Sequence, residues 1–237
     1  HPRNEDAYRL ESVADAIVAV VCDGVSTSTA PELASQRAVD AAARVLVVET
    51  EGEYESEPAV TTRAIRAATE SVRALPWSPA TGMGPPSCTL ISAICSGETI
   101  TIGAVGDSRA YWLDEQAAHM LTVDDSWAQE QIAAGAMTAE QALHDPRAHS
   151  ITRWIGRDAP PGPPEVVSWK PEVRGRLILC SDGLWNYASS PEELGALARG
   201  SDDGSPLHLA RRLTEYALEA GGHDNITVVV IDVVPDR

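Results

Sequence analysis

The stretch VAVVCDGVSTS, residues Val18 to Ser28, decides the fold of this chain. The apolar run Ile17–Cys22 ends abruptly at the dipeptide Asp23-Gly24. A short run of β-branched and small apolar residues that stops at a turn dipeptide is typical of a buried strand and the loop that leaves it. The sequence therefore predicts that the carboxylate of Asp23 stands at the open end of a sheet.

Three further aspartates stand beside apolar runs in the same way. They are Asp107 after Ile100–Val105, Asp182 after Leu177–Cys180, and Asp224 just before Ile226–Val233. Like charges gathered at one place destabilise a protein unless a cation neutralises them. Hard divalent cations prefer oxygen ligands, so the pattern predicts a divalent metal site at these strand ends.

Composition narrows the class of protein. The chain has 237 residues, is 43% hydrophobic, and carries 35 acids against 18 bases for a net charge of -17. Such a surface repels nucleic acid and anionic membranes, and no apolar run reaches the roughly 18 residues of a membrane span. Some acids are candidate metal ligands, and ordinary acidic solubility is the other explanation for the excess.

The four cysteines lie in apolar, strand-like runs. They are Cys22, Cys88, Cys95 and Cys180, and no two form a C-x-x-C pair. A zinc ribbon is therefore not supported, and we expect small reduced core residues of a cytoplasmic protein.

Hydrophobic periodicity predicts an α+β chain. Strands are expected over Ala7–Leu10, Ala16–Cys22, Cys88–Cys95, Thr99–Val105, Ala110–Leu113, His119–Thr122, Glu165–Trp169, Arg176–Cys180 and Ile226–Val233. Helices are expected over Pro31–Val48, Ala59–Leu75, Trp127–Ala134, a short segment after Thr138, Pro191–Ala198 and Pro206–Ala220. The first two strands should form a hairpin, the four strands between 88 and 122 a meander, and Leu33 should face inward. Helix pairs then cover antiparallel sheets from outside, and Asp125–Pro164 forms an insertion with little continuous core.

Seven motifs in one order carry a family resemblance. They are Arg3-Asn4-Glu5-Asp6, Asp23-Gly24-Val25, Gly106-Asp107-Ser108-Arg109-Ala110-Tyr111, Leu121-Thr122-Val123-Asp124, Ile151-Thr152-Arg153, Ser181-Asp182-Gly183-Leu184 and Asp224-Asn225-Ile226-Thr227. Together they resemble the metal-dependent protein phosphatases (the PPM, or type 2C, family). The resemblance implies one phosphatase domain over residues 1–237. It also implies a four-layer α-β-β-α sandwich of two antiparallel sheets flanked by helix pairs, with 125–164 as a flap beside the cleft.

The resemblance also implies roles for individual residues. Asp23 would bridge two metals, Gly24 would offer its carbonyl to one of them, Asp182 and Asp224 would complete the other, and Glu5 and Asp6 would bind the second metal directly or through water. Asp107 would join Asp182 at a weaker third site, and Asn225 would brace the cluster by hydrogen bonds. The implied ions are Mn²⁺ or Mg²⁺.

The chemistry expected of such a site is hydrolysis of phosphate monoesters. Two cations neutralise the phosphate, and a hydroxide shared between them attacks phosphorus without a phosphoenzyme. The family resemblance implies phosphoserine and phosphothreonine proteins as substrates, opposing serine/threonine kinases. Lys170 is the only lysine in a chain rich in alanine and arginine, which favours a bacterial source, and a monomeric cytoplasmic enzyme is expected.

Two features depart from the family pattern. The family usually opens with a full strand, and with an arginine four residues before the Glu5 position, where this sequence has His1. Either sequence upstream of His1 supplies that strand and arginine, or Arg3 contacts phosphate. The loop after Asp23-Gly24 has no histidine at the Val25 position, so protonation of the leaving group is expected to fall to metal-bound water.

Other functions fit the sequence less well. A single Asp-Gly is usually only a turn, so the argument rests on the joint occurrence of the motifs. No cysteine has an arginine six residues later, which excludes the cysteine-dependent phosphatases, and the elbow-like sequence around Ser108 lacks its last glycine and a following helix. A catalytically silent regulatory or binding module with a phosphatase fold remains the alternative, although Asp23, Asp182 and Asp224 are all present. The histidines His144, His149, His208 and His223 are predicted to be surface or helix-end residues.

Overall fold

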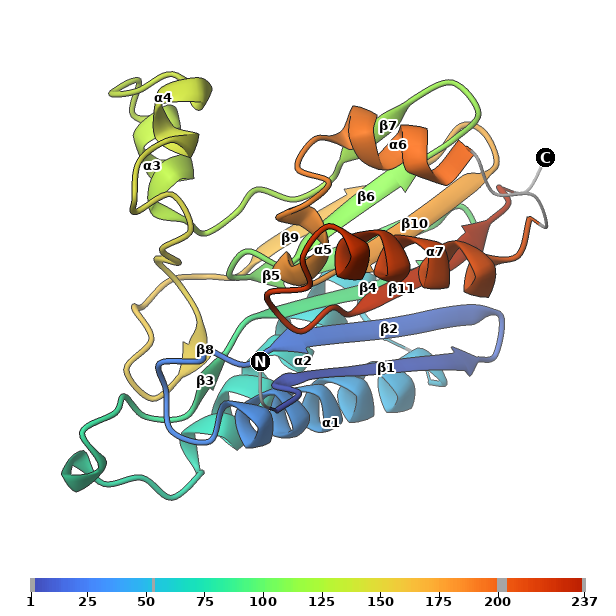
Figure 1. The fold of residues 1–237 in the computed structure, drawn as a ribbon. Coiled ribbons are helices and arrows are strands. Elements are labelled where there is room, and N and C mark those ends of the chain that lie inside the picture. Colours follow the sequence, from blue (N-terminus) through green and yellow to red (C-terminus); the bar gives the residue numbers. More distant parts are fainter. Residues whose placement is uncertain (1–2, 53, 200–203, 236–237) are drawn as a thin grey trace.

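The computed structural model describes residues 3–52, 54–199 and 204–235 (Figure 1). The strands are β1 Asp6–Val13, β2 Ala16–Asp23, β3 Ser87–Cys88, β4 Leu90–Ser96, β5 Thr99–Val105, β6 Arg109–Leu113, β7 Ala118–Met120, β8 Ile155–Gly156, β9 Glu165–Trp169, β10 Gly175–Cys180 and β11 Val228–Val233. The helices are α1 Pro31–Thr50, α2 Glu57–Arg73, α3 Trp127–Ala133, α4 Ala139–Leu143, α5 Asp182–Trp185, α6 Pro191–Arg199 and α7 Pro206–Glu219, with a 3₁₀ turn, η1, at Pro79–Thr81. No helix in these described ranges is long and apolar enough to cross a membrane.

The strands form two larger antiparallel sheets. The first has the order β1-β2-β4-β5-β9, the second has the order β11-β10-β6-β7, and β3 pairs with β8 outside both. The predicted hairpin is confirmed, because β1 and β2 pair antiparallel along their whole length, from Asp6 opposite Asp23 to Val13 opposite Ala16. The predicted α+β class with antiparallel sheets is confirmed as well.

Strand β2 shows why the sheet is apolar on both faces. Its alternate residues Val18, Val20 and Cys22 pack with the buried faces of α1 and α2, whereas Ala19 and Val21 pack against residues of the second sheet. A strand with both faces covered reads as a nearly continuous apolar run, which is why the sequence signal was strong here. Residues of β6, β10 and β11 that point the other way pack under α5, α6 and α7 (Figure 1).

The predicted meander is wrong. Strand β4 pairs with β5, and β6 pairs with β7, but β5 lies beside β9, while β6 lies beside β10 in the other sheet. The chain crosses between the sheets at Gly106-Asp107-Ser108. A turn after an apolar run looks the same in sequence whether the next strand returns to the same sheet or starts another one.

Several boundaries also differ from expectation. Strand β1 extends to Val13, so the tight turn is Ala14-Asp15, where Ala14 has a left-handed φ of 50°. The last strand starts at Val228 rather than Ile226, and Leu33, predicted to face inward, is 39% exposed. A break at Thr89 divides the predicted strand Cys88–Cys95 between β3 and β4.

The segment 125–164 projects from the sheets (Figure 1). Ser126 accepts a hydrogen bond from the Gln129 amide at the start of α3, and Thr138 forms a capping box with Gln141 at the start of α4. The two helices share only a small buried cluster around three alanines, Ala128, Ala142 and Ala148. This cluster is separate from the main core, as expected for a segment with little continuous core.

Candidate active site

The β1–β2 hairpin brings the first two carboxylates together. Asp6 begins β1, Asp23 ends β2, and the antiparallel register sets them opposite each other at one end of the sheet. Asp6 is buried, and its carboxyl lies close enough to that of Asp23 for the two to interact electrostatically. The pairing follows directly from the hairpin register, because a one-residue slip would send one carboxylate to the opposite face.

Asp107 and Asp182 reach the same place from the other sheet. Asp107 lies in the crossing turn after Gly106, whose φ is +103° and whose added Cβ would lie 2.7 Å from Thr89 Cγ2. Asp182 begins the four-residue helix α5 just after β10, and its carboxyl lies close enough to Asp23 to act on the charge of that residue. The sequence predicted a plain turn at Asp182-Gly183, because a single helical turn has no periodicity to detect.

The loop before β11 closes the cluster from a third direction. Asp224 and Asn225 lie there, and the Asn225 side-chain oxygen accepts a hydrogen bond of 2.8 Å from the backbone amide of Glu5. Gly183 of α5 packs so closely on this loop that an added Cβ would lie 2.0 Å from the Asn225 carbonyl oxygen. The Asn225 side chain therefore joins the Asp224 loop to Glu5, and a close backbone contact joins the same loop to α5.

Hydroxyl groups that the sequence analysis did not single out hold the buried carboxylate of Asp6. Ser181 Oγ donates to Asp6 Oδ2 at 2.8 Å and accepts from the Thr227 amide at 3.0 Å. Ser181 is fully buried directly before Asp182. Its position in the motif was visible in the sequence, but the hydrogen bond joins residues 175 positions apart, which no local pattern reports.

Crowding and burial raise the pKa values of these carboxyls. Burial, with neighbouring negative charge adding to it, raises the pKa of Asp6 to about 6 and that of Asp107 to about 8. Burial first, and then the charges of Asp6, Asp182 and Asp107, hold the pKa of Asp23 well above its usual range. Burial and the charge of Asp224 raise the pKa of Asp182. Without cations, the site therefore tends to hold protons.

The donor set fits hard divalent cations. Asp6 Oδ1 and Asp182 Oδ1 are buried without a hydrogen-bond partner. The carboxylate atoms that the cluster could offer to a metal ion are all oxygens. Oxygen-only ligands favour Mg²⁺ or Mn²⁺ over zinc. Within the described ranges, no three His, Cys, Asp or Glu side chains stand around one point as a formed metal site. The fit accordingly rests on donor chemistry and on the two unpartnered oxygens.

Gly24 and Glu5 lie at the edge of this cluster. The Gly24 amide donates to the Glu5 carbonyl at 3.1 Å, and an added Cβ on Gly24 would lie 2.6 Å from the Pro31 carbonyl oxygen. The Glu5 carboxylate accepts a hydrogen bond of 2.6 Å from Ser26 Oγ. A residue larger than glycine at position 24 would clash with the start of α1 and with the backbone of Glu5. Glycine at this position therefore allows the segment after Asp23 to pack closely on both.

Arg3 lies at the surface near the start of α1. Its side chain is 72% exposed, and its guanidinium pairs with Glu32 at 3.4 Å. His1, the other residue considered for phosphate contact, lies outside the described residues. The structure thus brings together the aspartates and Asn225, and it places Arg3 in an ion pair on α1.

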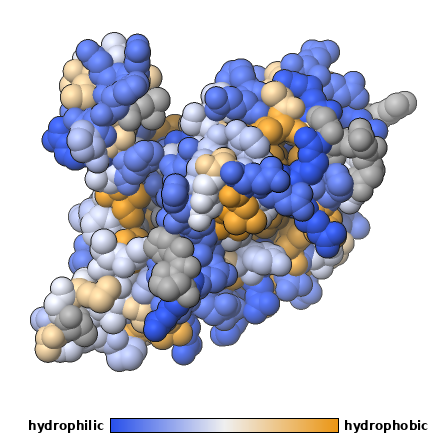
Figure 2. Space-filling model, in the orientation of Figure 1, coloured by the Kyte–Doolittle hydropathy of each residue, from blue (hydrophilic) through white to orange (hydrophobic). Residues whose placement is uncertain are grey.

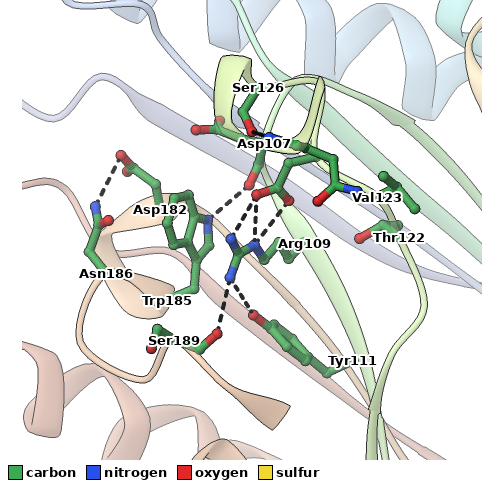
Figure 3. A network of polar contacts seen from close by, with 12 residues as sticks. Asp107, Arg109, Tyr111, Thr122, Val123, Ser126, Asp182, Trp185, Asn186 and Ser189 are labelled. Atoms are coloured by element: carbon green, nitrogen blue, oxygen red, sulfur yellow. Dashed lines mark hydrogen bonds and ion pairs between the residues drawn. The ribbon is translucent and has the colours of Figure 1, made fainter. Parts of the chain in front are cut away.

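A buried arginine beside the site had no role assigned from sequence (Figure 3). Arg109 is 9% exposed and makes a two-pronged ion pair with Asp124, with a shortest distance of 2.7 Å. Its guanidinium also lies 3.8 Å from the ring centroid of Trp185. Trp185 in turn donates its indole N–H to the Asp107 carbonyl at 2.8 Å. This chain of contacts fixes the backbone of Asp107, and the only hint in sequence was a charged residue at the start of the apolar run RAYWL.

His149 lies at the surface, as predicted, but it also contacts the site. It is exposed, and its ring stacks on Trp185 with centroids 5.8 Å apart and an interplanar angle of 22°. It is also close enough to Asp182 to interact with its charge. The histidine lies in the projecting segment, 33 residues before Asp182 in the chain, so only the fold brings the two together.

Comparison with known proteins identifies the family. The family model described as Protein phosphatase 2C matches residues 2–212. The chain belongs to the protein phosphatase 2C family. It is 32% identical over 234 residues to the serine/threonine protein phosphatase PstP of Mycobacterium tuberculosis, covering 98% of this chain and 42% of the relative. The chain therefore spans less than half the length of that curated relative.

Solved phosphatase structures of this family share the fold. A serine/threonine phosphatase of S. agalactiae superposes with a TM-score of 0.84 at 25% identity, covering 97% of this chain and 93% of that one. The catalytic domain of PstP in complex with two manganese ions superposes with a TM-score of 0.76 at 27% identity, covering 99% of this chain and 93% of that one. This phosphatase 2C chain thus shares its α+β architecture with a relative whose structure contains two manganese ions.

Proposed function

We propose that this chain is a metal-dependent serine/threonine phosphoprotein phosphatase. The observation that carries the proposal is the meeting of aspartates from four distant segments, two with unpartnered buried oxygens, in a phosphatase 2C fold. Bound Mn²⁺ or Mg²⁺ would neutralise the phosphate and acidify water. The catalytically silent alternative is weaker, because Asp23, Asp182 and Asp224 all reach the cluster.

Each residue of the cluster has a proposed task. Asp23 would hold both of two ions, the Gly24 carbonyl and Glu5 or Asp6 would hold one of them, and Asp182 with Asp224 would hold the other. Asp107 and Asp182 would hold a weaker third ion. Asn225 orients the Glu5 backbone, and Ser181 orients the Asp6 carboxylate, which is supported by their hydrogen bonds of 2.8 Å each. Arg3 is still proposed to contact the substrate phosphate. To do so, its guanidinium would have to break the ion pair with Glu32.

The relatives suggest the substrates and the setting. PstP and the S. agalactiae protein are serine/threonine phosphatases, which supports phosphoserine and phosphothreonine proteins as substrates and serine/threonine kinases as the opposing enzymes. All four cysteines are free and buried, which is consistent with a bacterial cytoplasm. The acidic surface argues against nucleic acid and membrane partners, and we infer a monomer.

We also infer the layering and the limits of the domain. Three core clusters separate two helix groups and two sheets, which supports one domain built as a four-layer α-β-β-α sandwich, with 125–164 as its flap. On β1, Tyr8 and Leu10 point toward the second sheet's side but are 61% and 45% exposed. This part of β1 therefore presents apolar side chains to solvent.

The change Asp182→Ala tests the metal assignment. It removes a carboxylate shared by two proposed ion sites, so hydrolysis of para-nitrophenyl phosphate with Mn²⁺ should fall at least a thousandfold. The thermal midpoint of the metal-free protein should hold or rise, because a repulsive buried charge is gone. Asp15→Ala, in the exposed turn at the opposite end of the hairpin, is the matched control and should leave both unchanged. Retained activity in Asp182→Ala would refute the assignment.

A further inference from the structure

A cavity of about 430 Å³ lies between the loop that follows Asp23-Gly24 and the flap. Three segments wall it: the loop after β2 at 25–28, the approach to β3 at 84–87, and the part of the flap at 149–158. Figure 2 shows hydrophobic surface in the recess between the α3–α4 lobe and the body of the protein. The cavity therefore lies where the flap meets the sheets.

The walls of this cavity are held in place by hydrogen bonds. The Val25 amide donates to the Ser87 carbonyl at 3.0 Å, and the Thr29 amide donates to the Gly84 carbonyl at 2.9 Å. On the flap side, the Trp154 indole N–H donates to Asp158 Oδ1 at 2.9 Å. Because these walls are already ordered, a ligand can bind between them without the entropic cost of ordering the loops.

Two of the segments that line the cavity are linked to the aspartates of the proposed active site. Val25 is two residues after Asp23 in the chain. On the opposite wall, His149 stacks on Trp185, which holds the Asp107 carbonyl. A phosphorylated side chain bound at the aspartates would therefore carry its neighbouring residues along this cavity.

The lining of the cavity is apolar with small hydroxyl groups. Its large contacts are Val25, Pro85, Ile151 and Trp154, and no lysine or arginine is among the described residues around it. Asp158 is the one carboxylate among these lining residues and would repel an acidic side chain, and the other titratable side chain is the imidazole of His149. An apolar side chain gains from leaving water here, by roughly 1.5–3 kcal/mol when fully buried, or about 10–150-fold in affinity.

We propose that this cavity is the subsite for a residue flanking the phosphorylated serine or threonine, and that it selects an apolar residue there. The inference rests on the proposed phosphatase activity. It makes Trp154 and Ile151 determinants of substrate specificity. The enzyme would then prefer phosphorylation sites in apolar contexts over the acidic contexts that its Asp158 disfavours.

The test is a series of phosphothreonine peptides assayed with Mn²⁺. Leu, Ala or Glu is placed in turn at each of the two positions on either side of the phosphothreonine, and kcat/KM is measured. At one position, Leu should exceed Ala by roughly tenfold, and Glu should fall below Ala. Both Trp154→Ala and Ile151→Ala should reduce the Leu-to-Ala ratio by roughly fivefold. Val123→Ala, an apolar truncation outside the cavity at a 52% exposed residue, is the matched control and should keep the wild-type ratio.

The outcomes separate this inference from the proposed function. Hydrolysis of all peptides at rates that ignore the flanking residue would overturn the cavity assignment and leave the phosphatase standing. A Leu preference that both cavity variants retain would also overturn it. No Mn²⁺-dependent hydrolysis of any phosphopeptide or of para-nitrophenyl phosphate would overturn the proposed function and, with it, this inference.

Discussion

The contact between Gly183 and Asn225 gives the sharpest single test of how the site is assembled. A methyl group at Gly183 would lie 2.0 Å from the Asn225 carbonyl oxygen, 2.8 Å from its carbon and 3.1 Å from Ile226 Cα. All three are backbone atoms, so no side-chain rotation can relieve the overlap. In Gly183→Ala, either α5 or the loop carrying Asp224 has to move, and both carry proposed metal ligands.

The size of the effect follows from two opposing contributions. Overpacking a close backbone contact costs about 1–3 kcal/mol or more, and alanine in place of glycine in a helix recovers about 0.5–1 kcal/mol. The net loss of roughly 1–2 kcal/mol corresponds to a fall of about 2–8 °C in the thermal midpoint for a chain of this length. Because Asp182 and Asp224 separate, the Mn²⁺ concentration for half-maximal activity should rise by at least about tenfold.

The assay pairs thermal unfolding with a manganese titration of para-nitrophenyl phosphate hydrolysis. Gly52→Ala is the matched control, because an added Cβ there meets only ordinary contacts at 3.8 Å. It should leave the manganese requirement unchanged. If Gly183→Ala behaves like Gly52→Ala in both measurements, the proposed close packing of α5 on the Asp224 loop is wrong.

Three other predictions concern the buried charges. The unfolded-state pKa is near 3.8, whereas burial raises the folded-state pKa of Asp6 to about 6 and that of Asp107 to about 8. The folded, metal-free protein thus holds protons that the unfolded chain releases, so its free energy of unfolding should fall as pH rises from about 4 to about 8, and Mn²⁺ should flatten that slope in pH-dependent chemical denaturation. Arg109→Leu should destabilise the fold by about 3–5 kcal/mol by leaving Asp124 buried and unpaired, and the double change to leucine at both positions should recover most of that loss in urea unfolding. Ser181→Ala should cost about 1–3 kcal/mol in the same assay and weaken Mn²⁺ binding measured by calorimetry, and an unchanged affinity would contradict its role in orienting Asp6.

Local sequence signals were sufficient where an element is long or apolar on both faces. Thr99–Val105 was predicted with the bounds that β5 has, and the hairpin of β1 and β2 was predicted from a short strand at Ala7–Leu10 followed closely by the apolar run Ala16–Cys22. The aspartates could be proposed as a group because each stands at the end of such a run. The family motifs then supplied their order along the chain.

What sequence could not supply was contact between distant segments. The crossing at Gly106-Asp107-Ser108 reads as an ordinary turn, so the change of sheet was missed. The stack of His149 on Trp185 depends on how the flap folds back, and the hydrogen bond from Ser181 to Asp6 joins residues 175 positions apart in the chain. Arg109 stood out only as a charge in an apolar run, since its partner Asp124 lies beyond the next strand.

The most direct test of the account is the manganese dependence of para-nitrophenyl phosphate hydrolysis by the purified protein. We predict hydrolysis that rises with added Mn²⁺, is lost in EDTA, and returns when Mn²⁺ is restored in excess. Hydrolysis that persists at the same rate in EDTA, or none despite measured Mn²⁺ binding, would contradict the claim that these aspartates form a metal-dependent phosphatase site.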